Sequence, residues 1–376
     1  TWGCQFWNAY YTDLAQVRMP PRRDAGYGNP HQVLDACRFW SWAYAQFNRM
    51  QAQLIRAEYG KGRKGKSAAG TPFVTTNFMP FHPDINPADL APDFDLMAWD
   101  AYPVGGTERT EGEAFRLGDP AWMGFVSDLM ASYHGRWGLM ELQPGQINWG
   151  AAPAMPYPGA VRLWLWTAFA HNAEFATTYR FRRPRFGIEL FHDGLMGPDG
   201  VTASPGGRQF AQVAEELTRL KPATPPPAEP LPAQRNCIGL LFDHDQLWWY
   251  LILPQGKRWD YPKLIQTWYR AATELGIAAQ ILGPNQPLPA DQEMRSEVAV
   301  PLIGTGNELV GVLNIESPLP NAFTDEDRQL LEALAVQAVI ALQEIRLLDA
   351  LVEIVEGLLT AQGNELFKLI IERACE

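Results

Sequence analysis

Helical and strand periodicities alternate along the first 221 residues of the chain. Apolar residues recur at spacings of three and four through residues 31–58, which predicts one long amphipathic helix. Four short segments rich in apolar, β-branched and aromatic residues predict strands, and three further helical patterns lie between or after them. The predicted strands are 72–78, 94–100, 136–142 and 174–181, and the helices are 121–133, 158–171 and 207–220. This alternation predicts an α/β fold with a parallel sheet, and four strand–helix units amount to the second half of a (β/α)8 barrel.

The pattern changes twice beyond residue 221. Residues 222–233 contain six prolines, which exclude a helix or a central strand and favour an extended, semi-rigid linker. A strand, a helix and a second strand are then predicted at 236–242, 259–275 and 277–282. Residues 295–317 alternate in polarity around a Gly-Thr-Gly-Asn turn, as in a hairpin, and Thr324 is the predicted N-cap of a following helix. The predicted domains are 1–221, 234–290 and 291–376, with the linker 222–233 after the first.

Composition and charge separate the last block from the rest of the chain. The chain has 376 residues, of which 47% are hydrophobic, and a formal net charge of −11. Residues 291–376 contain 16 acidic and 5 basic residues, an excess that equals the whole net charge. All 14 Trp lie at or before Trp268. An acidic balance disfavours nucleic-acid partners, because neutralising phosphates requires Lys and Arg.

The sequence shows neither a membrane-spanning run nor a secretory leader. Its longest apolar stretches are far shorter than the roughly 18 residues that span a bilayer, and no charged-then-apolar segment opens the chain. A start at Thr1 is typical of an internal fragment or a processed product. The four Cys are scattered without metal-ligand spacing, so free thiols in a cytoplasmic protein are expected, with no metal and no cofactor.

Residues 138–150, GLMELQPGQINWG, form the densest candidate site. Glu141 ends an apolar strand pattern and precedes a Pro-Gly turn, so its carboxylate is expected at the carboxyl end of a strand, where barrel enzymes hold their chemistry. Trp149 follows in the same loop, and a carboxylate beside an indole suits a sugar, whose apolar face packs on the ring. On spacing alone, a surface Glu with a packing Trp is an equal alternative. Other polar residues just beyond predicted strand ends are Asp100, Tyr102, Gln143 and Arg183.

Five collinear segments resemble glycoside hydrolase family 42 β-galactosidases, a retaining family with a TIM barrel. They are TWGCQFWNAYY (1–11), PFVTTNFM (72–79), WDAYP (99–103), MELQPGQINWG (140–150) and IELFHDGL (188–195). The resemblance implies that Glu141 is the nucleophile that forms a glycosyl-enzyme intermediate. It also implies that Trp7, Tyr102 and Trp149 line a galactose subsite and that Glu189 and His192 bind sugar hydroxyls. Glu189 and His192 have the i, i+3 spacing of a metal pair as an alternative, but no third ligand lies nearby in the sequence.

The resemblance further implies a second catalytic carboxylate that the sequence does not contain. A retaining glycosidase uses two carboxylates about 5 Å apart, and this family carries its acid/base Glu in an Asn-Glu-Tyr motif, which occurs nowhere in the chain. We therefore predict an impaired β-galactosidase. Glu141, Tyr102, Trp149 and Glu189 are expected to converge on one concave face, with no second carboxylate at that distance from Glu141.

Two further resemblances lie downstream of the linker. Residues 235–256, RNCIGLLFDHDQLWWYLILPQG, resemble the start of the family's flavodoxin-like trimerisation domain, and Asp243–Asp245 is expected to be a solvated loop rather than a metal site. Residues 295–317 and the following helix resemble the C-terminal half of a GAF domain, a sensory module.

Apolar residues at heptad spacing from Leu334 to Leu359 predict a homo-oligomer formed through the C-terminal helix. The expected partners are a β-galactoside and a second copy of the chain, with neither nucleic acid nor membrane. A GAF-type sensory or dimerisation protein that carries a non-catalytic glycosidase fragment is the alternative function. The join near residue 290 is also compatible with a gene-assembly artefact.

Overall fold

The computed structural model divides into two compact units. Unit 1 comprises Thr1–Gln255 with Gln280–Pro284, and unit 2 comprises Gly256–Ala279 with Asn285–Glu376. The residues that the structure describes are 11–20, 29–61, 73–105, 114–150, 154–220, 237–254, 256, 260–284, 296–304, 309–317 and 320–340. The linker 222–233, Trp7 and the part of the heptad pattern beyond residue 340 lie outside these ranges.

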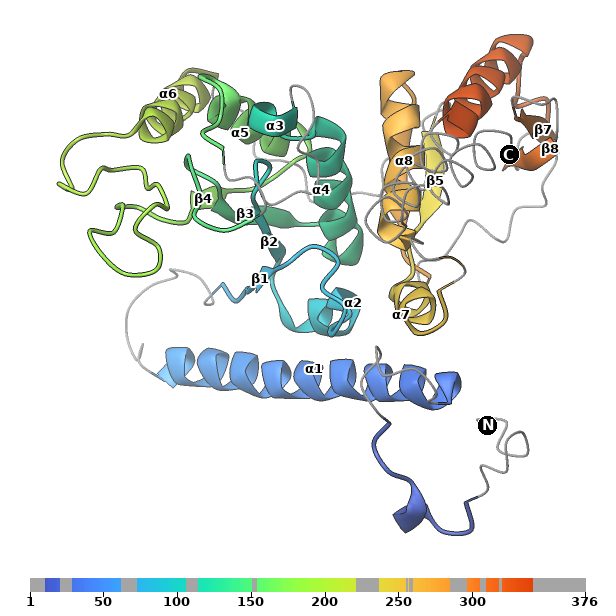
Figure 1. The fold of residues 1–376 in the computed structure, drawn as a ribbon, viewed down its shortest axis with the longest axis horizontal. Coiled ribbons are helices and arrows are strands. Elements are labelled where there is room, and N and C mark those ends of the chain that lie inside the picture. The colour runs from blue at the N-terminus through green and yellow to red at the C-terminus, as the bar shows by residue number, and fades with distance from the viewer. Residues whose placement is uncertain are drawn as a thin grey trace, which may run out of the picture. The chain divides into compact units, whose positions relative to one another are not determined.

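A four-stranded parallel sheet forms the centre of unit 1. Its strands are β1 (Asn77–Phe78), β2 (Met97–Ala101), β3 (Trp137–Leu142) and β4 (Ala176–Thr178), in the order β1-β2-β3-β4 (Figure 1). Each strand lies in or overlaps a predicted segment, and the α/β class is confirmed. Because all four strands run the same way, their carboxyl ends share one edge of the sheet.

Helices follow β2, β3 and β4 in the sequence. They are α3 (Ala114–Leu117), α4 (Pro120–His134), α5 (Ala160–Ala170) and α6 (Pro205–Leu220), and α4 contacts both β2 and β3. Asp119 caps α4 by accepting a hydrogen bond from the Ala121 backbone, and Gly135 ends the helix at φ 81°. Fully buried Trp99, Trp137 and Phe125 fill the core beside the two central strands.

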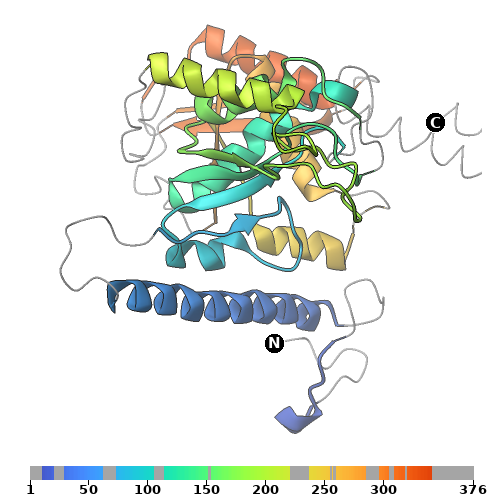
Figure 2. The same ribbon diagram turned by 90° about the vertical axis from the view of Figure 1, so that its left-hand side faces the viewer.

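The long helix α1 (Pro30–Lys61) packs differently from the expectation. It contacts α2 (Pro87–Leu90) and the short 3₁₀ helix η3 (Ala91–Asp93), and Figure 2 shows it as one straight rod. Small residues such as Ala45 and Ala52 are buried, whereas the aromatic stripe that includes Trp40 and Phe47 is about half exposed. Ser41 donates a hydrogen bond to Asp89, so close approach through small residues decides which face of α1 packs.

The segment after the linker contains two paired strands that are separated in the sequence by two helices. β5 (Cys237–Leu241) pairs with β6 (Ala278–Leu282), and α7 (His244–Ile252) follows β5. The predicted solvated loop at Asp243–Asp245 is wrong, because Asp243 caps α7 and accepts a hydrogen bond from the Asp245 backbone at 2.9 Å. A flavodoxin-like topology stays a prediction.

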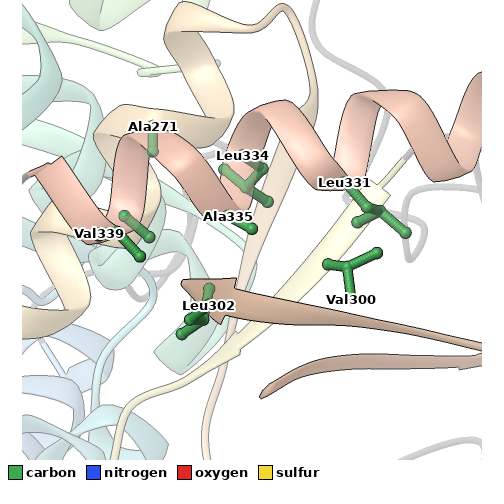
Figure 3. Packing of buried hydrophobic residues seen from close by; sticks show 8 residues of the cluster. Ala271, Val300, Leu302, Leu331, Leu334, Ala335 and Val339 are labelled. Carbon is green, nitrogen blue, oxygen red and sulfur yellow. The ribbon is translucent and has the colours of Figure 1, made fainter. Parts of the chain in front are cut away.

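Unit 2 is built around an antiparallel hairpin. β7 (Ser296–Ile303) pairs with β8 (Leu309–Ser317), and the hairpin packs against α8 (Tyr261–Glu274) and a helix described over 325–340. Figure 3 shows the shared core, whose buried members are Ala271, Val300, Leu302, Leu331, Leu334, Ala335, Ala338 and Val339. Leu334 and Ala338, the first positions of the heptad pattern, are therefore intramolecular core. Thr324 caps the last helix as predicted, since its hydroxyl accepts from the Asp327 backbone while Asp327 accepts from the Thr324 backbone.

Candidate functional site

Glu141 and Asp100 occupy equivalent positions at the carboxyl ends of neighbouring strands. The register of β2 against β3 pairs Asp100 with Glu141, after a shift between Trp99 and Asp100. Glu141 is partly buried, and Asp100 is buried with 5% of its surface exposed. The predicted position of Glu141 at the end of a strand is thus what the sheet shows.

Tyr102 holds the carboxylate of Glu141. Its hydroxyl donates to Glu141 Oε2 at 2.6 Å, a short bond of the kind formed with an ionised acceptor. The Tyr102 side chain is buried, and burial together with the Glu141 hydrogen bond raises the pKa of its phenol. Tyr102 therefore stays protonated and acts as a fixed donor that orients one oxygen of Glu141.

Aromatic rings surround this hydrogen bond. The Trp149 ring lies 4.7 Å from the Tyr102 ring, centroid to centroid, at an interplanar angle of 67°. Trp149 is 40% exposed, so part of its indole is open to solvent beside Glu141. The His192 ring stands edge-on to Tyr102 at 6.1 Å. An exposed indole next to a held carboxylate provides both an apolar platform and a charged group.

His192 is oriented by the backbone carbonyl of the residue that follows it. It is 1% exposed, and its Nδ1 lies 2.9 Å from the carbonyl oxygen of Asp193. Because a carbonyl only accepts, Nδ1 carries the proton, and in the neutral ring Nε2 is an acceptor. Within the described ranges Nε2 is buried and has no hydrogen-bond partner.

Glu189 joins the cluster through Tyr179. The Tyr179 hydroxyl donates to Glu189 Oε2 at 2.7 Å, and Arg180 Nη1 lies 3.0 Å from the same oxygen. The Tyr179 ring contacts His192 at 5.3 Å. The hydrogen bond to Glu189 raises the pKa of the Tyr179 phenol, and the charge of Glu141 adds to that effect. Tyr179 therefore links Glu189 to His192, and its phenol is also under the charge of Glu141.

Two loops that carry these residues are fastened to each other. The Gln146 backbone donates to Asp193 Oδ2 at 3.0 Å, and Asn148 Nδ2 donates to the Ile188 carbonyl at 2.6 Å. Gly145 is required here, because a Cβ at this position would lie 2.5 Å from Asp193 Oδ2. These contacts fix the Trp149 loop against the Glu189 loop.

Five of the six predicted site residues lie in the described part of the chain. Direct contacts link Glu141, Tyr102, Trp149 and His192, and Tyr179 connects Glu189 to them. The alternative of a Glu189–His192 metal pair has no support, since Glu189 binds Tyr179 and Arg180 instead. No group of three or more His, Cys, Asp or Glu in the described ranges is arranged to hold a metal ion. The sequence pattern did not indicate Asn77, Tyr179 and Asp193. Their roles depend on contacts with other segments of the chain, which are a neighbouring strand for Asn77 and neighbouring loops for Tyr179 and Asp193.

Asp100 has the most perturbed environment among the carboxyl groups of the cluster. Burial raises the pKa of this carboxyl to about 7, with the neighbouring charge of Glu141 adding to it and the Asn77 hydrogen bond opposing it. Asn77 Nδ2 donates to Asp100 Oδ2 at 2.8 Å.

A parallel α/β sheet with a held carboxylate, an exposed indole and further polar groups at its carboxyl edge is the arrangement of barrel-type glycoside hydrolases. Comparison with known families agrees. The glycoside hydrolase 42 family model, described as beta-galactosidase, matches residues 1–220, and a GAF domain model matches residues 278–343. The chain belongs to glycoside hydrolase family 42.

Relatives and solved structures extend this comparison. The chain is 36% identical over 294 residues to the beta-galactosidase BgaA of Thermus sp, covering 76% of this chain and 42% of that relative. Its fold matches the crystal structure of a beta-galactosidase from the psychrophilic Marinomonas ef1 with a TM-score of 0.66 and 31% identity, covering 76% of this chain and 43% of that one. The structure of a beta-galactosidase from the Antarctic haloarchaeon Halorubrum lacusprofundi matches with a TM-score of 0.66 and 32% identity. This match covers 76% of this chain and 41% of that one. The chain thus spans less than half the length of these relatives. In the part of the chain that the structure describes, no helix is both long and apolar enough to cross a membrane.

Proposed function

We propose that the chain binds the galactosyl unit of a β-galactoside at the cluster formed by Glu141, Tyr102, Trp149, His192 and Glu189. We further propose that Glu141 is the nucleophile of a retaining hydrolysis. The observation that carries the proposal is the 2.6 Å hydrogen bond from Tyr102 to Glu141, formed at a strand end beside the exposed Trp149 indole. The fixed donor leaves the other carboxylate oxygen to attack the anomeric carbon. Trp149 packs against the apolar face of the sugar, and His192 Nε2 accepts a hydrogen bond from a sugar hydroxyl.

Family membership supports galactose as the sugar, because the relatives compared above are described as beta-galactosidases. Trp7, predicted to line the same subsite, lies outside the described residues. Glu189 is proposed to bind a further hydroxyl, held in place by Tyr179 and Arg180.

The absence of an Asn-Glu-Tyr motif from the sequence determines how the function has to be tested. A general acid contributes about 10²–10⁴-fold to such a reaction when the leaving group is poor. We therefore propose that Glu141 reacts with galactosides whose leaving group needs no protonation, and that alkyl galactosides turn over slowly.

The experiment is to incubate the full chain with 2,4-dinitrophenyl 2-deoxy-2-fluoro-β-galactoside and to measure the intact mass. This reagent has a good leaving group, and its fluorine slows hydrolysis of the intermediate. One fluorogalactosyl adduct per chain is expected, located on Glu141 by peptide mapping. Glu141→Gln should give no adduct. Glu174→Gln is the matched control, because Glu174 pairs with Arg136 at the opposite, amino end of the sheet. An unlabelled wild-type chain, or equal labelling of Glu141→Gln, contradicts the proposal.

A further inference from the structure

Asp100 is a buried carboxyl group for which the proposed reaction has no role. Its Cα lies opposite that of Glu141 in the register of β2 with β3. Tyr102, two residues further along, faces the same side of the sheet as Asp100 and donates to Glu141 Oε2. Asp100 therefore faces the same side as Glu141, one strand away.

The surroundings of Asp100 are poorly suited to a negative charge. Its Oδ2 accepts one hydrogen bond, from neutral Asn77 on β1 at 2.8 Å. Its Oδ1 is buried and has no hydrogen-bond partner in the described part of the chain, and no Lys, Arg or His there forms an ion pair with it. The titratable groups that face it are Glu141 on β3 and Tyr102 beyond its own strand. A carboxylate that is buried, has one neutral donor and lies beside a like charge is costly in its ionised form. Protonation removes this cost.

We infer that Asp100 is a positioning residue for Glu141: the two carboxyl groups carry a single negative charge between them, with the proton held on Asp100. The raised pKa of Asp100, about 7, supports this arrangement below neutral pH, where most of Asp100 is protonated. Ionisation of Asp100 then adds a second negative charge on the strand next to Glu141. Because the transition state at the anomeric carbon is cationic, that charge speeds glycosylation of Glu141. This last consequence rests on the proposed function, whereas the shared charge does not.

The shared charge is tested by carboxyl ¹³C NMR of the full chain, labelled at Asp and titrated from pH 4 to pH 9. The signal of Asp100 is the one missing in Asp100→Asn, a substitution that keeps the shape of the side chain. A midpoint near pH 7 is expected in the wild type. Glu141→Gln should move it to lower pH, because the opposing charge is gone, while the control Glu174→Gln should leave it unchanged. A midpoint that is the same in Glu141→Gln and in the wild type overturns the inference.

The positioning role is tested by the rate of Glu141 labelling as a function of pH. Between pH 6 and pH 8 the wild-type rate should rise several-fold with the same midpoint as the NMR titration. Asp100→Asn should show no such step, although it is still labelled. An unchanged step in Asp100→Asn overturns the positioning role. Failure of the wild type to label at any pH counts against the proposed function, and the NMR titration still decides the shared charge.

Discussion

Replacing Asp100 with Asn should stabilise the protein at high pH and change its stability little at low pH. The folded state raises the pKa of Asp100 from 3.8 to about 7, so between these values the folded chain binds more protons than the unfolded chain. Stability therefore falls as the pH rises through this window and stays lower above it. A difference of about 3 pKa units, at about 1.4 kcal/mol each, sets an upper limit of about 4 kcal/mol for the penalty above pH 7. Because Asp100 is only 5% exposed, solvent screening reduces this free-energy penalty little.

The assay is urea unfolding of the wild type and Asp100→Asn at pH 4, 6, 8 and 9, followed by tryptophan fluorescence. Twelve of the 14 Trp lie in unit 1, among them fully buried Trp99 directly before Asp100, so the signal reports mainly on unit 1. The free-energy difference between variant and wild type should grow from near zero at pH 4 to a few kcal/mol at pH 8. Asp119→Asn is the control, since Asn retains the N-cap of α4. A difference that does not vary with pH refutes the reasoning.

Three other measurements test separate contacts. Tyr102→Phe removes a hydrogen bond to a charged group and should lower the free energy of unfolding by about 1.5–3 kcal/mol, measured by the same urea unfolding. Burial lowers the pKa of His171, but the hydrogen bond and charge of Asp128 outweigh it and leave that pKa raised. The stabilisation from this pair is complete below the ordinary pKa of 6.5 and is lost as the pH rises through the folded value, so Asp128→Asn should cost more at pH 5.5 than at pH 8.5. Removing residues 344–376 should abolish self-association in sedimentation, and added salt should strengthen association of the full chain, because the predicted seam is flanked mainly by acidic residues.

The periodicity of apolar residues predicts the elements of unit 1, because burial determines both the apolar pattern in the sequence and the packing of the helices and strands. β3 was predicted at 136–142 and spans Trp137–Leu142, with Glu141 near its end. The capped start of α4 follows from Asp119 and Pro120, a local signal that needs no tertiary information. The contact face of α1 could not be predicted in this way. Its large residues satisfy a helical period, but the helix packs through Ala45 and other small residues.

The shape of the candidate site was predictable only in part. The order of motifs indicates which strand ends carry Glu141 and Tyr102, and the structure joins them. The pairing of Asp100 with Glu141 depends on the register shift after Trp99, which leaves no mark in the polarity pattern. The Asp193 contacts with Gln146 link residues 47 positions apart, so no local rule describes them.

The C-terminal part of the chain shows that local sequence patterns also fail to define which segments form one domain. Composition changes near residue 290, yet α8, which precedes that point, contributes Ala271 and Trp268 to the core of the hairpin in unit 2. Charge and aromatic content describe the surface of a segment, whereas apolar packing decides which segments form one unit. The predicted boundary at 290 stays a prediction.

The same burial has opposite effects on two groups of the candidate site. A low-dielectric strand end strengthens the hydrogen bond from Tyr102 to Glu141, and it makes an ionised Asp100 costly. Replacing Asp100 with an apolar residue would remove that cost but would leave Asn77 Nδ2 without its partner. Asp100→Asn keeps an acceptor for Asn77 and removes only the titration. It therefore separates the electrostatic contribution of Asp100 from its hydrogen bond, which a substitution by Leu or Ala cannot do.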